Sequence, residues 1–176
     1  MPHAYPESWL LTDERVGDAL WAMLRRVPPG SGVIFRHHAT PPRRRSALFL
    51  RVRRIAQARR LLLLAADPPL PGAAGRHGRV AGATSWPAHT RSEARAAQRD
   101  GARLLLLSPA YATRSHPGVR PTGPAALARL ARDTRLPMIA LGGMNRRRYR
   151  RLRLLGFTGW AAIDAWLPPP SPLLGR

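Results

Sequence analysis

The chain has 176 residues, enough for one domain with a sizeable hydrophobic core, and a formal net charge of +21 at pH 7. It has no cysteine, which excludes disulfides, thiolate catalysis and cysteine-ligated zinc, and no lysine, which excludes Schiff-base aldolase chemistry. No apolar run approaches the roughly 20 residues of a membrane span, and the first residues lack the pattern of a signal peptide, so we expect a cytoplasmic protein.

The positive charge alone would suggest a nucleic-acid partner or an anionic surface. All 30 basic residues are arginine, however, and the chain is rich in alanine, proline and glycine, a composition that indicates GC-rich codon usage. The arginines are also spread through most of the expected helices instead of forming one stripe with interleaved aromatic residues. We therefore favour a solubilising or incidental basic surface over a specific nucleic-acid site.

In the first half of the chain, short apolar runs alternate with segments whose apolar residues recur at helical spacing. In chain order the expected elements are a strand at 8–12, a helix at 17–26, a strand at 32–36, a helix at 41–60 and a strand at 61–67. Residues 68–72 contain three prolines, which exclude a regular helix there, and residues 75–82 predict at most a stunted strand.

The second half is more regular. The expected elements are a helix at 92–101, a strand at 104–107, a helix at 123–134, a strand at 138–141, a helix at 145–155 and a strand at 160–163. This alternation indicates parallel βαβ units with right-handed crossovers. With six clear strands and one or two doubtful ones, the sequence predicts an α/β fold, a TIM (β/α)₈ barrel that is trimmed or irregular around its third to fifth βα units. A doubly wound open sheet is the alternative.

We expect one barrel domain over residues 1–167, followed by a Pro-rich tail at 168–176. Active sites of such barrels lie at the carboxyl ends of the strands. There, Gly142 and Gly143 follow a buried strand, and without Cβ atoms they let the backbone approach a ligand and offer N–H groups to a phosphate. Thr113, Arg114 and Ser115 supply hydroxyls and a guanidinium from the preceding loop. The two loops together predict a phosphate site.

Two charged residues end earlier strands. Asp67 either begins the proline-rich turn or ligates magnesium. Arg36 either pairs with Asp67 or Asp13, or holds a diphosphate through two parallel hydrogen bonds.

The histidines are more typical of structural or solvated groups than of catalytic ones, His77 and His116 included. The adjacent pair His37 and His38 is no metal motif, because neighbouring residues on a strand point in opposite directions. We expect both to be surface or loop residues.

Three motifs follow one another along the chain. They are the Ala-His-Thr-x-Ser-Glu that starts at Ala88, the Ser-Pro-Ala-Tyr-Ala-Thr that ends at Thr113, and the Ile-Ala-Leu-Gly-Gly-Met that starts at Ile139. In this order they resemble the thiamine-phosphate synthase/TenI family of TIM barrels, and the resemblance is best between Ala88 and Asp164. By this resemblance the chain is a divergent, shortened member of the family.

Thiamine-phosphate synthases join a hydroxymethylpyrimidine diphosphate to a thiazole phosphate and release diphosphate with the help of magnesium. The resemblance implies that Arg36 holds the diphosphate, that Asp67 binds Mg²⁺, and that Arg36 and His116 are the catalytic residues. The residues implied in contact with the thiazole phosphate are Thr113, Ser115, Gly142 and Gly143.

The chain also departs from the family pattern. Ile34 stands where the family has a glutamine that contacts the pyrimidine, His116 stands in place of a lysine, and Asp164 replaces a small hydroxyl residue. A second acidic metal ligand has no counterpart, and Pro109 stands where the tautomerase branch has a histidine. We therefore keep two alternatives to the enzyme, a non-catalytic barrel that binds phosphate or thiazole phosphate, and an arginine-rich nucleic-acid binder.

Overall fold

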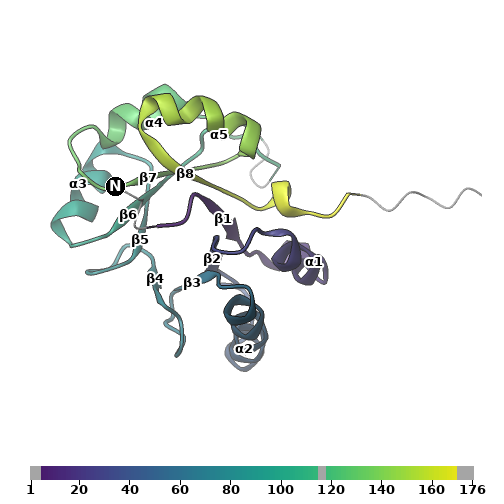
Figure 1. Ribbon diagram of the computed structural model, residues 1–176. Coiled ribbons are helices and arrows are strands. Elements are labelled where there is room, and N and C mark those ends of the chain that lie inside the picture. The colour runs from purple at the N-terminus through teal and green to yellow at the C-terminus, as the bar shows by residue number, and fades with distance from the viewer. Residues whose placement is uncertain (1–4, 115–117, 170–176) are drawn as a thin grey trace, which may run out of the picture.

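Eight parallel strands close into a barrel in chain order, in a computed structural model that describes residues 5–114 and 118–169 (Figure 1). The strands are β1 (Ser8–Leu11), β2 (Gly32–Phe35), β3 (Leu62–Ala66), β4 (Gly75–His77), β5 (Ser85–Ala88), β6 (Leu104–Leu107), β7 (Met138–Leu141) and β8 (Phe157–Ala162). Strand β8 pairs with β1, which closes the sheet. The TIM-barrel prediction is confirmed, and the open-sheet alternative is wrong.

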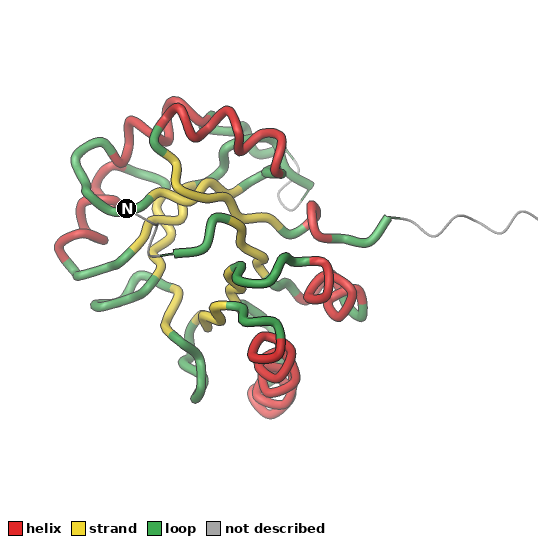
Figure 2. Tube along the Cα trace, viewed as in Figure 1, coloured by secondary structure: helices red, strands yellow, loops and turns green. Residues whose placement is uncertain are grey.

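The helices lie outside the barrel (Figure 2). They are α1 (Ala19–Arg26), α2 (Pro42–Ala58), α3 (Arg91–Arg99), α4 (Pro124–Ala131) and α5 (Arg146–Leu152), with short 3₁₀ turns η1 (Glu14–Val16), η2 (Arg153–Leu155) and η3 (Asp164–Trp166). Local sequence sets their starts. Helix α3 begins with a capping box in which Thr90 and Glu93 satisfy each other's backbone N–H groups, and Asn145 caps α5.

The barrel is irregular where the sequence predicts it. In the described part of the chain, β3 connects to β4 and β4 to β5 without a helix, so no helix covers these strands between α2 and α3 (Figure 1). Strand β4 has three residues and joins β5 through the single pair His77 and Ser85. Strand β5 is absent from the expected elements because Pro87 interrupts its apolar pattern.

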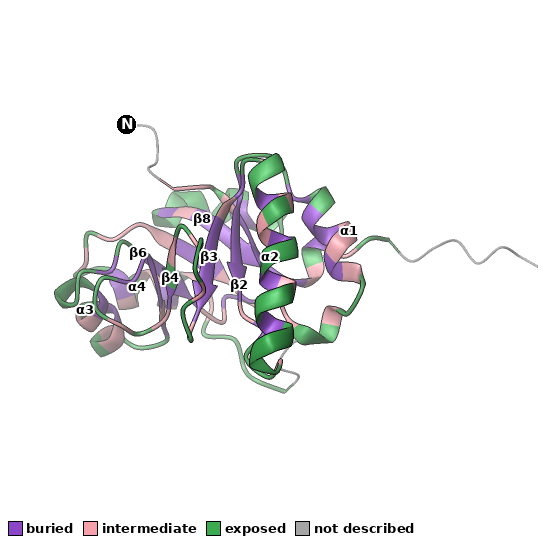
Figure 3. Cartoon of the chain, turned by 90° about the horizontal axis from the view of Figure 1, so that it is seen from below, coloured by how far each residue is buried: buried purple, intermediate pink, exposed green. Residues whose placement is uncertain are grey.

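The core is built from the strands and the inner faces of the helices. Figure 3 shows the strands buried and the outward faces of α1 and α2 exposed. Leu10, Ile34, Leu64 and Leu105 are fully buried, and each such side chain stabilises the fold by about 1.5–3 kcal/mol relative to leaving it exposed. Among the described residues, no helix combines the length and the apolar character that crossing a membrane requires.

Candidate functional site

A cavity of about 260 Å³ lies at the carboxyl ends of the strands, where barrel enzymes place their active sites. Arg36, Thr113, Gly142 and Gly143 line this cavity, so four residues that the sequence analysis singled out come together. Much of the remaining wall is apolar and comes from the ends of β6, β7 and β8. Ser115 and His116 lie outside the described residues.

The glycine turn after β7 is packed against the loop after β6. The backbone N–H of Tyr111 donates to the carbonyl oxygen of Gly142 at 3.0 Å. A Cβ on Gly143 would overlap the carbonyl oxygen of Ala112, and Gly143 has a φ of 58°, in the left-handed region. The Arg148 guanidinium donates to the Gly143 carbonyl and lies 4.5 Å from the centre of the Tyr111 ring. The absence of a Cβ on Gly143 therefore allows the two loops to pack closely against each other.

Arg36 is held by its backbone. Its N–H donates to the hydroxyl oxygen of Thr12 at 3.1 Å, and that hydroxyl also bonds His37 Nδ1 at 2.9 Å. His37 lies in the loop after β2, but it is buried, with 4% of its surface exposed, and stacks on Phe35. His37 is thus a loop residue, as expected, but it does not lie on the surface. Burial lowers the pKa of this histidine, so it is neutral at pH 7.

The carboxylates considered as partners of Arg36 have other partners. Asp67 Oδ1 lies 2.7 Å from the Arg76 guanidinium, and Asp13 bonds both the side chain and the backbone N–H of Arg15. The side-chain bond to Arg15 is the main reason that the pKa of Asp13 is lowered. No ion pair or hydrogen bond of the Arg36 guanidinium occurs among the described residues, which leaves this cation available to a ligand.

Asp164 lines the cavity beside the glycine turn. Its Oδ2 lies 3.1 Å from Nε of Arg114, so an arginine stands next to the carboxylate. A carboxylate repels a phosphate dianion, and the guanidinium offsets that repulsion in part.

Two histidines at strand ends, His89 and His77, make side-chain hydrogen bonds. His89 Nδ1 lies 2.9 Å from the carbonyl oxygen of Ser108, and because a carbonyl only accepts, Nδ1 carries the hydrogen and Nε2 of the neutral ring is a free acceptor. His89 also lines the cavity, and the sequence analysis gave it no role because it follows the unrecognised strand β5. Buried His77 bonds Ser85, and burial lowers its pKa to about 4.

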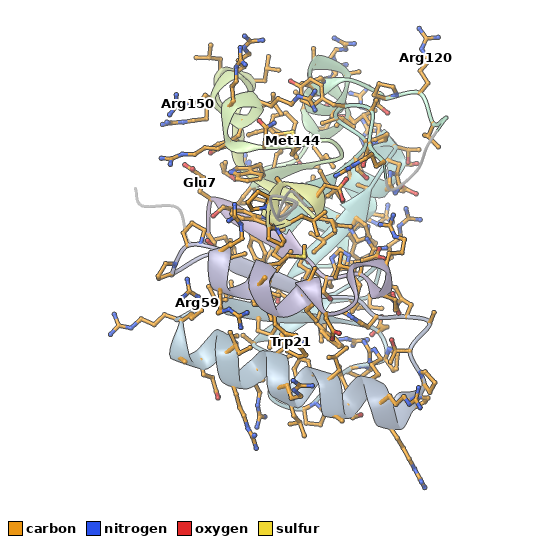
Figure 4. All side chains as sticks on the ribbon, turned by 90° about the vertical axis from the view of Figure 1, so that its right-hand side faces the viewer. Glu7, Trp21, Arg59, Arg120, Met144 and Arg150 are labelled. Atoms are coloured by element: carbon orange, nitrogen blue, oxygen red, sulfur yellow. The ribbon has the colours of Figure 1, made fainter. Side chains whose placement is uncertain are left out.

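The basic surface does not form one stripe. Arg120 and Arg150 point away from the barrel in different directions, whereas the guanidinium of Arg59 donates to the carbonyl oxygen of Val27 (Figure 4). This distribution agrees with the interpretation that most of the positive charge is solvated rather than gathered into a nucleic-acid site.

Fold and site together define a (β/α)₈ barrel with a small, partly cationic cavity at the carboxyl ends of its strands. The family model described as thiamine monophosphate synthase matches residues 80–166. The thiamine-phosphate synthase of Syntrophomonas wolfei is 34% identical over 76 residues, which are 43% of this chain and 36% of that protein. A thiamine-phosphate synthase-type protein of Aquifex aeolicus is 32% identical over 80 residues, 46% of this chain and 43% of that protein.

Among solved structures, the thiamine phosphate pyrophosphorylase of Pyrococcus furiosus superposes with a TM-score of 0.75 at 20% identity, covering 90% of this chain and 86% of that chain. Residues 80–166, just under half of the chain, thus match the thiamine-phosphate synthase family, and the chain shares the barrel fold of that pyrophosphorylase. The sequence matches span less than half the length of either curated relative.

Enzymes of this family typically use Mg²⁺, but the residues of this chain do not fit a magnesium site well. Magnesium in such sites takes one or two carboxylates together with substrate phosphates, in near-octahedral geometry. At the ends of β2 to β4 the available carboxylate is Asp67, and the guanidinium of Arg76 is already bonded to it. The described residues contain no group of three or more His, Asp or Glu side chains that could hold a metal. Magnesium binding by Asp67 stays a prediction from the resemblance.

Proposed function

We propose that this chain is a thiamine-phosphate synthase-like transferase. The carbon–oxygen bond between the pyrimidine methylene group and the diphosphate breaks, the thiazole nitrogen forms a bond to that carbon, and diphosphate leaves with the electron pair. What carries the proposal is the cavity that brings Arg36, Thr113 and the Gly142–Gly143 turn to one end of the barrel in a chain whose residues 80–166 match this family.

In this assignment the thiazole phosphate lies in the cavity. A volume of about 260 Å³ is slightly below the usual range for small-molecule sites, so it suits one ring with its phosphate rather than both substrates. Thr113 and Ser115 supply hydroxyls, and the Gly142–Gly143 turn supplies backbone N–H groups to the phosphate oxygens. The apolar wall from β6 to β8 excludes water around the ring.

The diphosphate lies toward the end of β2, where Arg36 has no competing partner among the described residues. Negative charge accumulates on the diphosphate oxygen as the bond breaks, and a guanidinium fixed at that point stabilises the transition state more than the ground state. The bond from the Arg36 backbone to Thr12 limits how far this residue can move. His116 remains a proposed catalytic residue on the resemblance alone.

The second candidate is a non-catalytic barrel that binds thiazole phosphate. One observation favours it, the Asp164 carboxylate in the cavity wall, which weakens binding of a phosphate dianion.

Formation of thiamine phosphate from the two substrates, followed by chromatography, separates the candidates. The enzyme assignment predicts product, a loss of at least 100-fold in kcat/KM for Arg36→Ala, and no loss for Arg103→Ala. Arg103 is an exposed arginine just before β6, at the opposite end of the barrel. Absence of product with retained binding of thiazole phosphate would support the non-catalytic barrel, and absence of both would refute the proposal.

A further inference from the structure

The aspartates that follow strands at the carboxyl end of the barrel are paired with arginines. In the part of the chain that the structure describes, these ion pairs are Asp13 with Arg15 at 2.7 Å, Asp67 with Arg76 at 2.7 Å, and Asp164 with Arg114 at 3.1 Å. Each pair places a guanidinium against at least one oxygen of the carboxylate. At this end of the barrel these carboxylates therefore already have arginine partners.

The middle pair lies beside Arg36. Strand β3 is hydrogen-bonded to β2 on one side and to β4 on the other, and Asp67 directly follows β3. Arg36 directly follows β2, and Arg76 is the middle residue of β4. The two arginines thus flank the end of β3 from both sides. The positive charge of Arg36 also contributes to lowering the pKa of His77, which agrees with a short distance between the ends of β2 and β4.

Arg76 can turn toward an anion at small cost. Its side chain is 46% exposed and that of Asp67 is 42% exposed, and exposed ion pairs contribute little to stability. A guanidinium bonds phosphate oxygens in a fork of two parallel hydrogen bonds, which is stronger and more directional than a single contact. A diphosphate that reaches the end of β3 therefore meets two guanidinium groups.

We propose that the diphosphate group of the substrate is bound by Arg36 and Arg76 without a divalent metal, and that Asp67 holds Arg76 in place in the absence of the ligand. The inference rests on the proposed function for the identity of the ligand. The binding itself requires no turnover, so it can be measured with inorganic diphosphate alone.

The experiment is calorimetric titration of inorganic diphosphate into the full chain, once in EDTA and once in excess Mg²⁺, at the same ionic strength. A site made of arginines predicts saturable one-site binding in EDTA that is no weaker than binding in Mg²⁺. Arg76→Ala should weaken binding in EDTA at least tenfold, whereas Arg103→Ala, which removes the same charge at the opposite end of the barrel, should change it less than twofold.

Two further variants make the test specific to the guanidinium. Arg76→Lys keeps the charge without the fork and should give an intermediate affinity, and it serves as the second variant if Arg76→Ala does not fold. In Arg76→Ala the Asp67 carboxylate is released, so Mg²⁺ should now strengthen diphosphate binding. Adding Asp67→Ala to that variant should abolish the gain.

Three results of the binding experiments would overturn the inference. These are binding in EDTA at least tenfold weaker than in Mg²⁺, no saturable binding in EDTA, and equal effects of Arg76→Ala and Arg103→Ala. Failure of the proposed function has a different signature. Metal-independent diphosphate binding without thiamine phosphate formation would leave this inference standing, whereas turnover that strictly requires Mg²⁺ would sustain the enzyme and refute the arginine site.

Discussion

Substitution of Gly143 by alanine tests the contact between the two loops that form one side of the cavity. The new Cβ would overlap the carbonyl oxygen of Ala112 and would lie 3.0 Å from Cβ of Tyr111, tighter than ordinary van der Waals contact. The φ of 58° at Gly143 adds a second cost, because a residue with a Cβ is strained there. The loop after β6 must therefore shift or the turn must change its conformation.

The magnitude follows from two contributions. The left-handed backbone costs about 1–2 kcal/mol for alanine. Forcing an extra methyl group into a packed contact costs about 1–3 kcal/mol. The matched control is Gly101→Ala, since Gly101 has a φ of 74° but no heavy atom within 4 Å of the place that a Cβ would take, so it carries only the first cost.

Urea unfolding followed by tryptophan fluorescence, together with thermal melts, measures both variants against the wild type. We expect Gly143→Ala to be destabilised by about 2 kcal/mol more than Gly101→Ala, a difference of roughly 4–8 °C in Tm for a domain of this size. Binding of thiazole phosphate should weaken in Gly143→Ala only. Equal destabilisation of the two variants, with unchanged binding in both, would refute the described packing of the loops.

Three further outcomes are expected. Asp164→Asn should tighten binding of thiazole phosphate several-fold by titration calorimetry, because it removes a like charge and frees Arg114; unchanged or weaker binding would contradict the electrostatic role. His77 has a pKa of about 4 in the folded state against 6.5 for the unfolded chain, so its neutral form contributes stability at neutral pH that is lost as pH falls from 6.5 to 4, about 3 kcal/mol in all. His77→Gln should flatten the pH dependence of the unfolding free energy between pH 6.5 and 4. An unchanged slope would show that His77 is not the cause of this dependence. Arg45 is buried, and its guanidinium donates to the backbone carbonyl oxygens of Ala66 and Pro68 on either side of Asp67. Arg45→Ala should therefore raise the rate of amide hydrogen exchange in residues 65–70, whereas Arg44→Ala, at an exposed arginine, should not. Equal exchange rates in the two variants would contradict a role of Arg45 in positioning this segment.

Much of the barrel could be predicted because its strands are buried on both sides. Such strands read as short apolar runs, and residues 61–67 and 104–107 are almost pure leucine and alanine. Strand β5 could not be recognised, since its sequence Ser-Trp-Pro-Ala contains a residue that cannot donate to a ladder. The fold tolerates Pro87 because it lies beyond the single residue pair that joins β5 to β4.

The candidate site was predictable in part. Polar residues directly after buried strands mark the carboxyl end of a parallel barrel, which is why Arg36, Thr113, Gly142 and Gly143 meet at one cavity. Which groups the side chains near the cavity contact depends on packing between distant parts of the chain, and no local sequence pattern predicts it. The burial of His37 against Phe35 and the pairing of Asp67 with Arg76 instead of Arg36 are both of this kind.

Titration of thiazole phosphate into the wild-type protein and into Thr113→Val tests the central assignment most directly. Thr113 lines the cavity, and valine keeps the branched shape of threonine while removing the hydroxyl. The account predicts saturable one-site binding that weakens at least tenfold in Thr113→Val. No saturable binding by the wild type, or equal affinity in the two proteins, would contradict the assignment of this cavity to a phosphorylated thiazole.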